Sequence, residues 1–420
     1  MKAKIAPTSP KYKEKEKNIE NFYSANNLSR IDQPPKKTRS AFYALIISLI
    51  IGVIAGFFGG LLFNLLLINY PDSFLLKRLN LNLPLSNQTI IKEENNYQSK
   101  LETQRQEIVQ NIKPSLVNIF FKKENSSNLF EQVYSESEIL GSGVVLTSDG
   151  WIITTNSVIS DLSKKYSIVE DNKTIYEVTN LLQDTATNFV LLKVDSTDLK
   201  PVKFVDPDSL KAGQEEIVLR NDIPVNSFDL VVTNIVNLDY KNSQLIQSSE
   251  RFSRRIKAED SLGASFSGAA LINYKGEVIG LSTRENENNN IFIPSSYLNN
   301  KLISILLKEK EIQRPYLGIN YIDLSRTTNV PGTLSQKMTS GALILGDQKS
   351  DIQAIIPQSP AETAGLKEND IILSVDDTEI NQTSNLTETI QDYSVGENIT
   401  LKILRKDKEQ EVKVTLSKVR

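Results

Sequence analysis

Hydrophobic positions follow different patterns in three parts of the chain. Residues 41–69 form an unbroken apolar run without a charged side chain. Short apolar or alternating runs separated by Gly, Asp and Asn then fill the chain from Leu116 to about Ser282. From about residue 315 to 420, strand-like runs mix with two short helical patterns, at 359–365 and 384–393. Because crossing a bilayer takes about 20 apolar residues, the pattern predicts a transmembrane helix, an all-β unit and an α+β unit.

The apolar run has two alternatives, a buried soluble helix and a cleaved signal peptide. A soluble helix would show a polar face, and a signal peptide would have a shorter apolar region before a small-residue cleavage site. Neither pattern is found in residues 41–69. The basic cluster at residues 36–39 outweighs Lys77 and Arg78 beyond the run, which predicts a single-pass protein of the cytoplasmic membrane with its N-terminus inside and its later domains extracytoplasmic.

The predicted boundaries follow from these shifts in pattern. Residues 1–40 hold ten basic and four acidic side chains and are expected to form a disordered cytoplasmic tail. We expect a linker at 70–104, with a helix from about Ser99 to Ile112, and a β domain at 105–310 that ends in a helix over about 295–310. The second folded domain is expected at 315–420.

Composition excludes several classes of function. A balance of 48 basic and 51 acidic residues gives a net charge of −3, so nucleic-acid binding through bulk charge is not expected. The chain has no cysteine, which excludes disulfides and thiolate chemistry, and no histidine, which removes the commonest general base and zinc ligand. We expect no metal and no cofactor.

Three motifs in the β region resemble those of the HtrA-type trypsin-fold serine proteases. Their residues are Gly141–Leu146 with Asp149–Ile159, then Asp184–Val194, then Ser265–Asn273 with Gly276–Gly280. This resemblance implies a mainly β fold, a trypsin-like double six-stranded β-barrel. It also places Ser267 at the nucleophile position of a serine endopeptidase.

The same alignment of motifs reveals departures from a working site. Ser157 stands at the position of the catalytic histidine, and Asn188 at that of the catalytic aspartate. Ser265 replaces the glycine whose N–H group would help to bind the oxyanion. A hydroxyl is far too weak a base near pH 7, and a neutral amide does not stabilise a cation, so proton transfer from Ser267 lacks an acceptor. A lysine could serve as a substitute base, but the spacing of Lys257 or Lys164–Lys165 does not recommend any of them.

The C-terminal unit resembles the PDZ domain of the same family. Tyr316, Leu317, Gly318 and Ile319 match its carboxylate-binding loop, called here the carboxylate loop, and Pro357–Ile372 matches its second motif. The loop would receive a terminal carboxylate on successive backbone N–H groups while the peptide adds as a strand to the sheet. A turn that only packs is the alternative.

These residues lead to two main hypotheses of function. The first is a membrane-anchored pseudoprotease that binds unfolded proteins or C-terminal peptides outside the cytoplasmic membrane. The second is an active HtrA-type endopeptidase of envelope quality control that uses Ser267 with a non-standard base. A purely structural anchor would leave the carboxylate loop without a task. The resemblance also suggests a homotrimer or a hetero-oligomer with an active paralogue.

Overall fold

The computed structural model describes residues 39–69, 87–124, 126–205, 209–221, 228–241, 244–285 and 290–419. It divides the chain into two units, residues 1–93 and 94–420. The predicted basic tail falls on residues 1–40 and lies, apart from its last two residues, outside the described residues, as do residues 70–86 of the predicted linker.

The first unit contains helix α1 (Arg39–Asn69). Within it, Tyr43–Leu65 is a stretch of 23 residues with a mean hydropathy of 2.6 and no buried surface. By length and composition this helix can cross a membrane, as the apolar run predicted. Helix α3 (Asn87–Ile112) begins about three turns earlier than the expected start at Ser99, inside the segment predicted as linker. Its last turns pack Ile108, Val109 and Ile112 into the core of the second unit.

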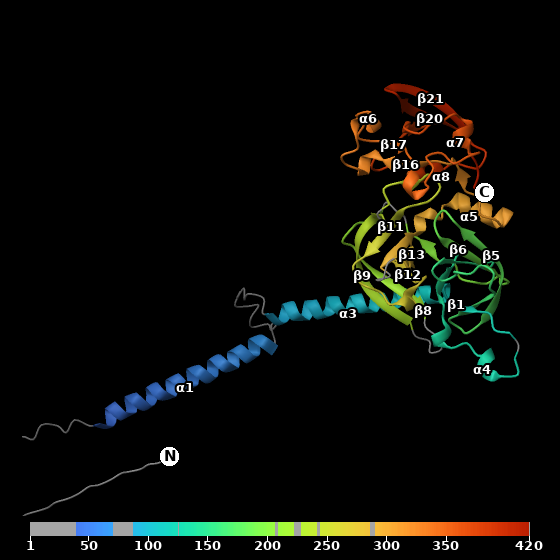
Figure 1. Cartoon of the computed structure of the whole chain (residues 1–420). Helices are drawn as coiled ribbons and strands as arrows, with labels where there is room; N and C mark the ends of the chain where they lie inside the picture. Colours follow the sequence, from blue (N-terminus) through green and yellow to red (C-terminus); the bar gives the residue numbers. More distant parts are fainter. Residues whose placement is uncertain are drawn as a thin grey trace, which may run out of the picture. The chain divides into compact units, whose positions relative to one another are not determined.

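The first β-barrel is closed by six antiparallel strands in the order β1-β2-β3-β6-β5-β4. Strands β1, β5 and β6 of this barrel are labelled in Figure 1. These strands are β1 (Leu116–Phe121), β2 (Gly141–Val145), β3 (Trp151–Thr155), β4 (Tyr166–Glu170), β5 (Ile175–Asp184) and β6 (Phe189–Val194). Alternating β-branched and leucine side chains from β1, β3 and β6 fill the barrel interior. The short helix α4 (Leu129–Gln132) lies in the connection between β1 and β2.

The second barrel follows the order β12-β8-β9-β11-β14-β13, and a β12–β13 pairing closes it. Its strands are β8 (Glu215–Asn221), β9 (Phe228–Lys241), β11 (Arg254–Ala258), β12 (Ala270–Ile272), β13 (Glu277–Thr283) and β14 (Ile291–Pro294), with β7 (Lys203–Phe204) added in parallel to β13. Helix α5 (Asn300–Glu309) follows the barrel and starts after Asn299, whose side chain caps it.

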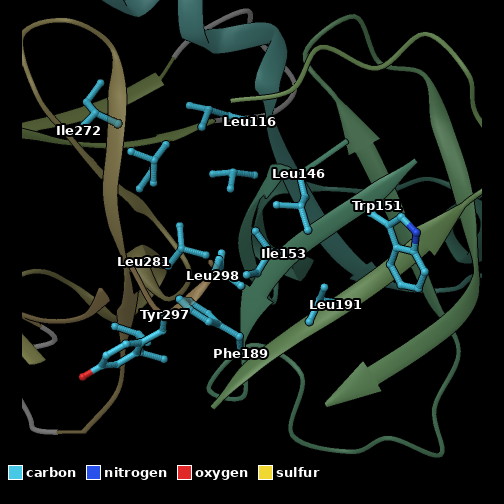
Figure 2. Packing of buried hydrophobic residues seen from close by; sticks show 14 of the residues in the cluster. Leu116, Leu146, Trp151, Ile153, Phe189, Leu191, Ile272, Leu281, Tyr297 and Leu298 are labelled. Carbon is cyan, nitrogen blue, oxygen red and sulfur yellow. The ribbon is translucent and has the colours of Figure 1, made fainter. Parts of the chain in front are cut away.

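The largest apolar cluster lies between the two barrels. Figure 2 shows Leu116, Ile153 and Phe189 of the first barrel facing Ile272 and Leu281 of the second. Helices α3 and α5 contribute further apolar side chains to the cluster. The junction of the barrels is therefore a packed core, and it fixes the turns at its edge, where the predicted site residues lie.

Within the second unit, the C-terminal part of the chain forms a sheet with short helices, as predicted for a PDZ domain. Its sheet runs β10-β16-β17-β18-β20-β21, with β19 beside β18, and β15 pairs separately with β22. The elements are β10 (Gln247–Ser248), β15 (Pro315–Tyr316), β16 (Asn320–Asp323), α6 (Gly332–Ser335), β17 (Ala342–Ile344), α7 (Pro360–Thr363), β18 (Ile371–Val375), β19 (Thr378–Glu379), α8 (Leu386–Gln391), β20 (Asn398–Arg405), β21 (Lys408–Thr415) and β22 (Ser417–Lys418). Strand β10 precedes β11 in sequence and joins this sheet from the barrel side.

Candidate functional site

The predicted nucleophile lies in a tight turn, Gly263–Gly268, called here the Ser267 turn. Residues Ala264–Phe266 form a 3₁₀ helix, and Gly268 adopts a φ of 74°. A Cβ atom on Gly268 would lie 2.1 Å from the carbonyl oxygen of Ser142, so only glycine fits there. The N–H group of Ser142 donates to the Ser267 carbonyl at 2.9 Å. Contacts with the first barrel thus fix the turn.

The Ser267 hydroxyl is buried, with 1% of the residue exposed, and has two recorded partners. It donates to the Ala264 carbonyl at 3.0 Å and accepts from the Arg284 guanidinium at 3.3 Å. An arginine side chain has donors only and stays protonated in proteins, so Arg284 cannot take the proton of the hydroxyl. Arg284 comes directly after β13, and no motif in the sequence marks it.

The N–H groups of the Ser267 turn are directed inward. The Ser267 N–H donates to the Ala264 carbonyl at 3.2 Å, and the Phe266 N–H donates to the Gly263 carbonyl at 3.0 Å. Ser265 is exposed within the 3₁₀ helix and does not adopt a positive φ. In this geometry the Ser267 N–H is not available to an oxyanion, which requires donors aimed at one point.

Ser157 and Asn188 lie near the same edge of the barrel junction. The hydroxyls of Ser157 and Thr155 are 2.7 Å apart, and Thr155 also donates to the Ser282 carbonyl, which accepts from Gly268 N–H. The Asn188 carbonyl accepts from Asn156 N–H at 2.9 Å. The fold therefore gathers the three positions, while no direct hydrogen bond among Ser157, Asn188 and Ser267 is recorded for the described residues.

Asn188 adopts the left-handed backbone conformation, with a φ of 74°. Asparagine tolerates this conformation better than most residues, so a structural role in the turn is sufficient to explain the side chain. Asp184 opens the same turn: its carboxylate accepts from Ala186 N–H at 3.1 Å and from the Thr187 hydroxyl at 2.8 Å. The turn is thus built by side chains other than that of Asn188.

A buried ion pair connects this turn with the start of the PDZ unit. Arg314 Nη2 lies 2.6 Å from Asp184 Oδ2, and the two side chains are 5% and 1% exposed. The guanidinium also donates to the Tyr297 carbonyl at 3.0 Å and lies over the Phe252 ring, 5.3 Å from its centroid. The sequence did not indicate this pair, because its members are 130 residues apart.

The carboxylate loop points its N–H groups at one oxygen. The N–H groups of Leu317 and Gly318 donate to Glu250 Oε1 at 3.2 and 2.8 Å. Gly318 has a φ of 85°, and a Cβ there would lie 2.2 Å from Ser359 Cβ. Tyr316 ends β15, and Ile319 precedes β16 with its N–H directed to Ser249 Oγ at 3.1 Å. The loop binds a carboxylate through its backbone, and that carboxylate is the chain's own.

Two family models match the chain. A trypsin-like peptidase domain matches residues 141–281, and a PDZ domain matches residues 315–416. The fold and the order of its domains thus define a trypsin-fold protein with a C-terminal PDZ domain. This combination of domains is that of HtrA-type serine proteases, and the matches support an HtrA-type protein.

Curated relatives from several bacteria agree with this assignment. The chain is 29% identical over 276 residues to the "Putative serine protease HhoB" of Synechocystis, covering 64% of each chain. It is 26% identical over 342 residues to the "Serine protease Do-like HtrA" of Bacillus subtilis, covering 76% of this chain and 74% of that protein. The chain spans between 56% and 64% of the length of the first three curated relatives that it matches.

Solved structures agree with the fold. The "HtrA-type protease AlgW with decapeptide" aligns with a TM-score of 0.56 at 18% identity, covering 74% of this chain and 98% of that one. The mainly β architecture with two closed six-stranded barrels and a PDZ domain is confirmed. The assignments of Ser267, Ser157, Asn188 and Ser265, and of the carboxylate loop as a peptide site, stay predictions.

Proposed function

We propose that this protein is a membrane-anchored pseudoprotease that binds unfolded proteins or C-terminal peptides outside the cytoplasmic membrane. One observation carries the proposal: the Ser267 hydroxyl lies between the Ala264 carbonyl and the Arg284 guanidinium, and neither group can act as a general base. The absence of histidine from all 420 residues supports the same conclusion.

The proposed loss of hydrolysis has two separate physical causes. Removing the serine or the histidine from a working triad lowers turnover by up to about a million-fold. Removing one oxyanion donor lowers it by a further factor of about 100 to 1,000. Here Ser157 replaces the base, and the Ser267 N–H is engaged by Ala264.

The names of the relatives support a second candidate, an endopeptidase that uses Ser267 with a non-standard base, and a lysine would be such a base. Lys257 lies ten residues before Ser267, but its Nζ lies over the Tyr240 ring, 5.2 Å from the centroid. Lys164 and Lys165 are exposed, and Lys165 is 3.9 Å from Glu124. These contacts favour the binding protein.

Peptide binding is proposed to use the carboxylate loop, because its mechanism needs backbone N–H groups and not catalytic side chains. The loop residues Leu317 and Ile319 have buried apolar side chains, and these favour peptides with an apolar terminal side chain. Helix α1 would anchor the protein, and the basic residues 36–39 favour a cytoplasmic N-terminus. A homotrimer or a hetero-oligomer with an active paralogue remains part of the proposal through the family resemblance.

The test uses the full chain in detergent. We expect no cleavage of unfolded casein and no labelling by a fluorophosphonate serine probe, but binding of a peptide with a free, apolar C-terminus. The same peptide with an amidated C-terminus is the control ligand. Gly318→Asp should abolish peptide binding, because the new side chain would collide with Ser359. Casein cleavage or probe labelling that disappears in Ser267→Ala would overturn the proposal.

A further inference from the structure

The edge of the PDZ sheet is paired with a strand from the protease-like part of the chain. Gln247 and Ser248 form β10, which lies antiparallel to β16 with Gln247 opposite Tyr321 and Ser248 opposite Asn320. The Ser249 N–H continues the pairing by donating to the Ile319 carbonyl at 3.0 Å. An extended strand added to a sheet edge is the mode by which PDZ domains bind peptides.

The other side of this strand contacts helix α8. The Thr387 hydroxyl, in the first turn of α8, donates to the Ser248 carbonyl at 2.8 Å. The Tyr321 hydroxyl lies 2.9 Å from Thr387 Oγ1, and Ser249 is fully buried. Residues 247–250, called here the internal strand, therefore fill the space between β16 and α8.

The internal strand ends with its acid in the carboxylate loop. Glu250 Oε1 receives the N–H groups of Leu317 and Gly318, and the Ser249 hydroxyl donates to the same oxygen at 2.6 Å. Glu250 Oε2 receives the Ser248 hydroxyl at 2.9 Å. Both carboxylate oxygens are thus hydrogen-bonded. Charge-assisted bonds of this kind are about twice as strong as those between neutral groups.

The segments before and after the internal strand make contacts with both the protease-like barrel and the PDZ domain. Before it, Asp239 of β9 pairs with Arg326 of the PDZ unit. After it, Phe252 stacks on Tyr297 with ring centroids 3.9 Å apart, and Arg254 pairs with Glu388 of α8 at 3.0 Å. Such a short tether gives the internal strand a high effective concentration at the groove, of the order of millimolar or more.

We propose that the resident ligand of this PDZ groove is the chain's own segment Gln247–Glu250, with Glu250 in the place of a peptide's terminal carboxylate. The segment lowers the affinity for external C-terminal peptides, because only the fraction of molecules with a vacated groove can bind them. This effect on external peptides rests on the proposed function, whereas occupation of the groove by Glu250 does not.

The test compares Glu250→Ala and Glu250→Gln with the wild type in the full chain in detergent. Glu102→Gln is the matched control, because Glu102 is an exposed carboxylate on α3. Two quantities are measured: the amide hydrogen exchange of Leu317, Gly318 and Ile319, and the affinity for a fluorescent peptide with a free, apolar C-terminus. Far-UV circular dichroism and thermal unfolding verify the fold, and Glu250→Gln, which keeps the side-chain shape, replaces Glu250→Ala if the latter does not fold.

We expect Glu250→Ala to speed exchange at the three amides and to tighten peptide binding, each by about tenfold, with a smaller change in Glu250→Gln and none in Glu102→Gln. Faster exchange without peptide binding by any variant would support the internal ligand and refute the proposed peptide-binding function. Exchange and affinity equal to those of the wild type in both Glu250 variants would overturn the internal ligand.

Discussion

The Ser267 turn and the carboxylate loop are both turns whose backbone N–H groups could bind an anionic oxygen, and they differ in where those groups point. In the Ser267 turn, the Ser267 N–H donates to Ala264 of the same turn. In the carboxylate loop, the N–H groups of Leu317 and Gly318 converge on an oxygen from another part of the chain. The loop has kept its glycine at a positive φ, whereas Ser265 occupies the corresponding position of the turn.

The comparison shows how differently the two kinds of site depend on side chains. Hydrolysis needs a base, an orienting acid and an aligned backbone at once, and under the proposed function Ser157, Asn188 and Ser265 each remove one of these parts. Carboxylate binding needs only a backbone conformation that one glycine makes accessible. Under the proposed function, a binding site of this kind persists in a chain whose reaction centre has lost its chemistry.

The largest effect is expected from rebuilding the reaction centre. Ser157→His with Asn188→Asp restores a base and its partner, but we expect little hydrolysis while the Ser267 N–H stays bonded to Ala264. Adding Ser265→Gly should raise the rate by about a hundredfold or more, because the oxyanion donor becomes available. Casein cleavage measures the rate, and the same triple variant with Ser267→Ala is the control. Equal rates in the double and triple variants would show that the backbone is not limiting.

The second-largest effect is expected from breaking the buried ion pair between Arg314 and Asp184. Arg314→Ala leaves Asp184 as a buried charge without its partner and should lower the free energy of unfolding by about 3–5 kcal/mol. Lys402→Ala is the control, because the Lys402–Glu409 pair is about half exposed and exposed pairs of this kind contribute little to stability. Denaturant unfolding measures both changes. Similar losses in the two variants would contradict a structural connection through the buried pair.

The smallest effect is expected from Glu216, a buried carboxylate that differs from Glu250 in its hydrogen bonds. Glu250 has partners on both oxygens, whereas Glu216 of β8 is fully buried and neither of its oxygens has a partner among the described residues. Glu216 lies on the face of β8 that carries Val218 into the second barrel. Burial, with a smaller contribution from Glu215, raises the pKa of Glu216 to about 7.

The direction of the pH effect follows from this raised pKa. Between about pH 4.5 and pH 7 the folded protein keeps a proton that the unfolded chain has lost, so stability falls as the pH rises through this window and is level above it. Glu216→Gln should remove the dependence. We expect similar stability at pH 4 and a gain of about 3 kcal/mol at pH 8 in denaturant unfolding. Parallel pH profiles of the two proteins would contradict this account.

The sequence by itself predicted the elements whose pattern is local. Alternating apolar residues indicated β1, β2, β3 and β6, and the glycine of the carboxylate loop indicated its turn. The sequence of strand β11, RRIKA, is charged, so it has no run of apolar residues that predicts a strand. Arg255 lies buried in that strand since Glu285 pairs with it at 2.7 Å, a partner 30 residues away. Local patterns do not reveal such pairs.

The sequence also determined what the reaction centre lacks, because a missing histidine cannot be supplied by any fold of this one chain. Only the tertiary structure decided which side chains contact the two sites: Arg284 at the Ser267 hydroxyl, and Glu250 in the carboxylate loop. Glu250 and Gly318 are 68 residues apart and meet because strand β10, from the protease-like part of the chain, pairs with β16 of the PDZ sheet. Which carboxylate fills a backbone site depends on this long-range packing, and a sequence motif specifies only the site.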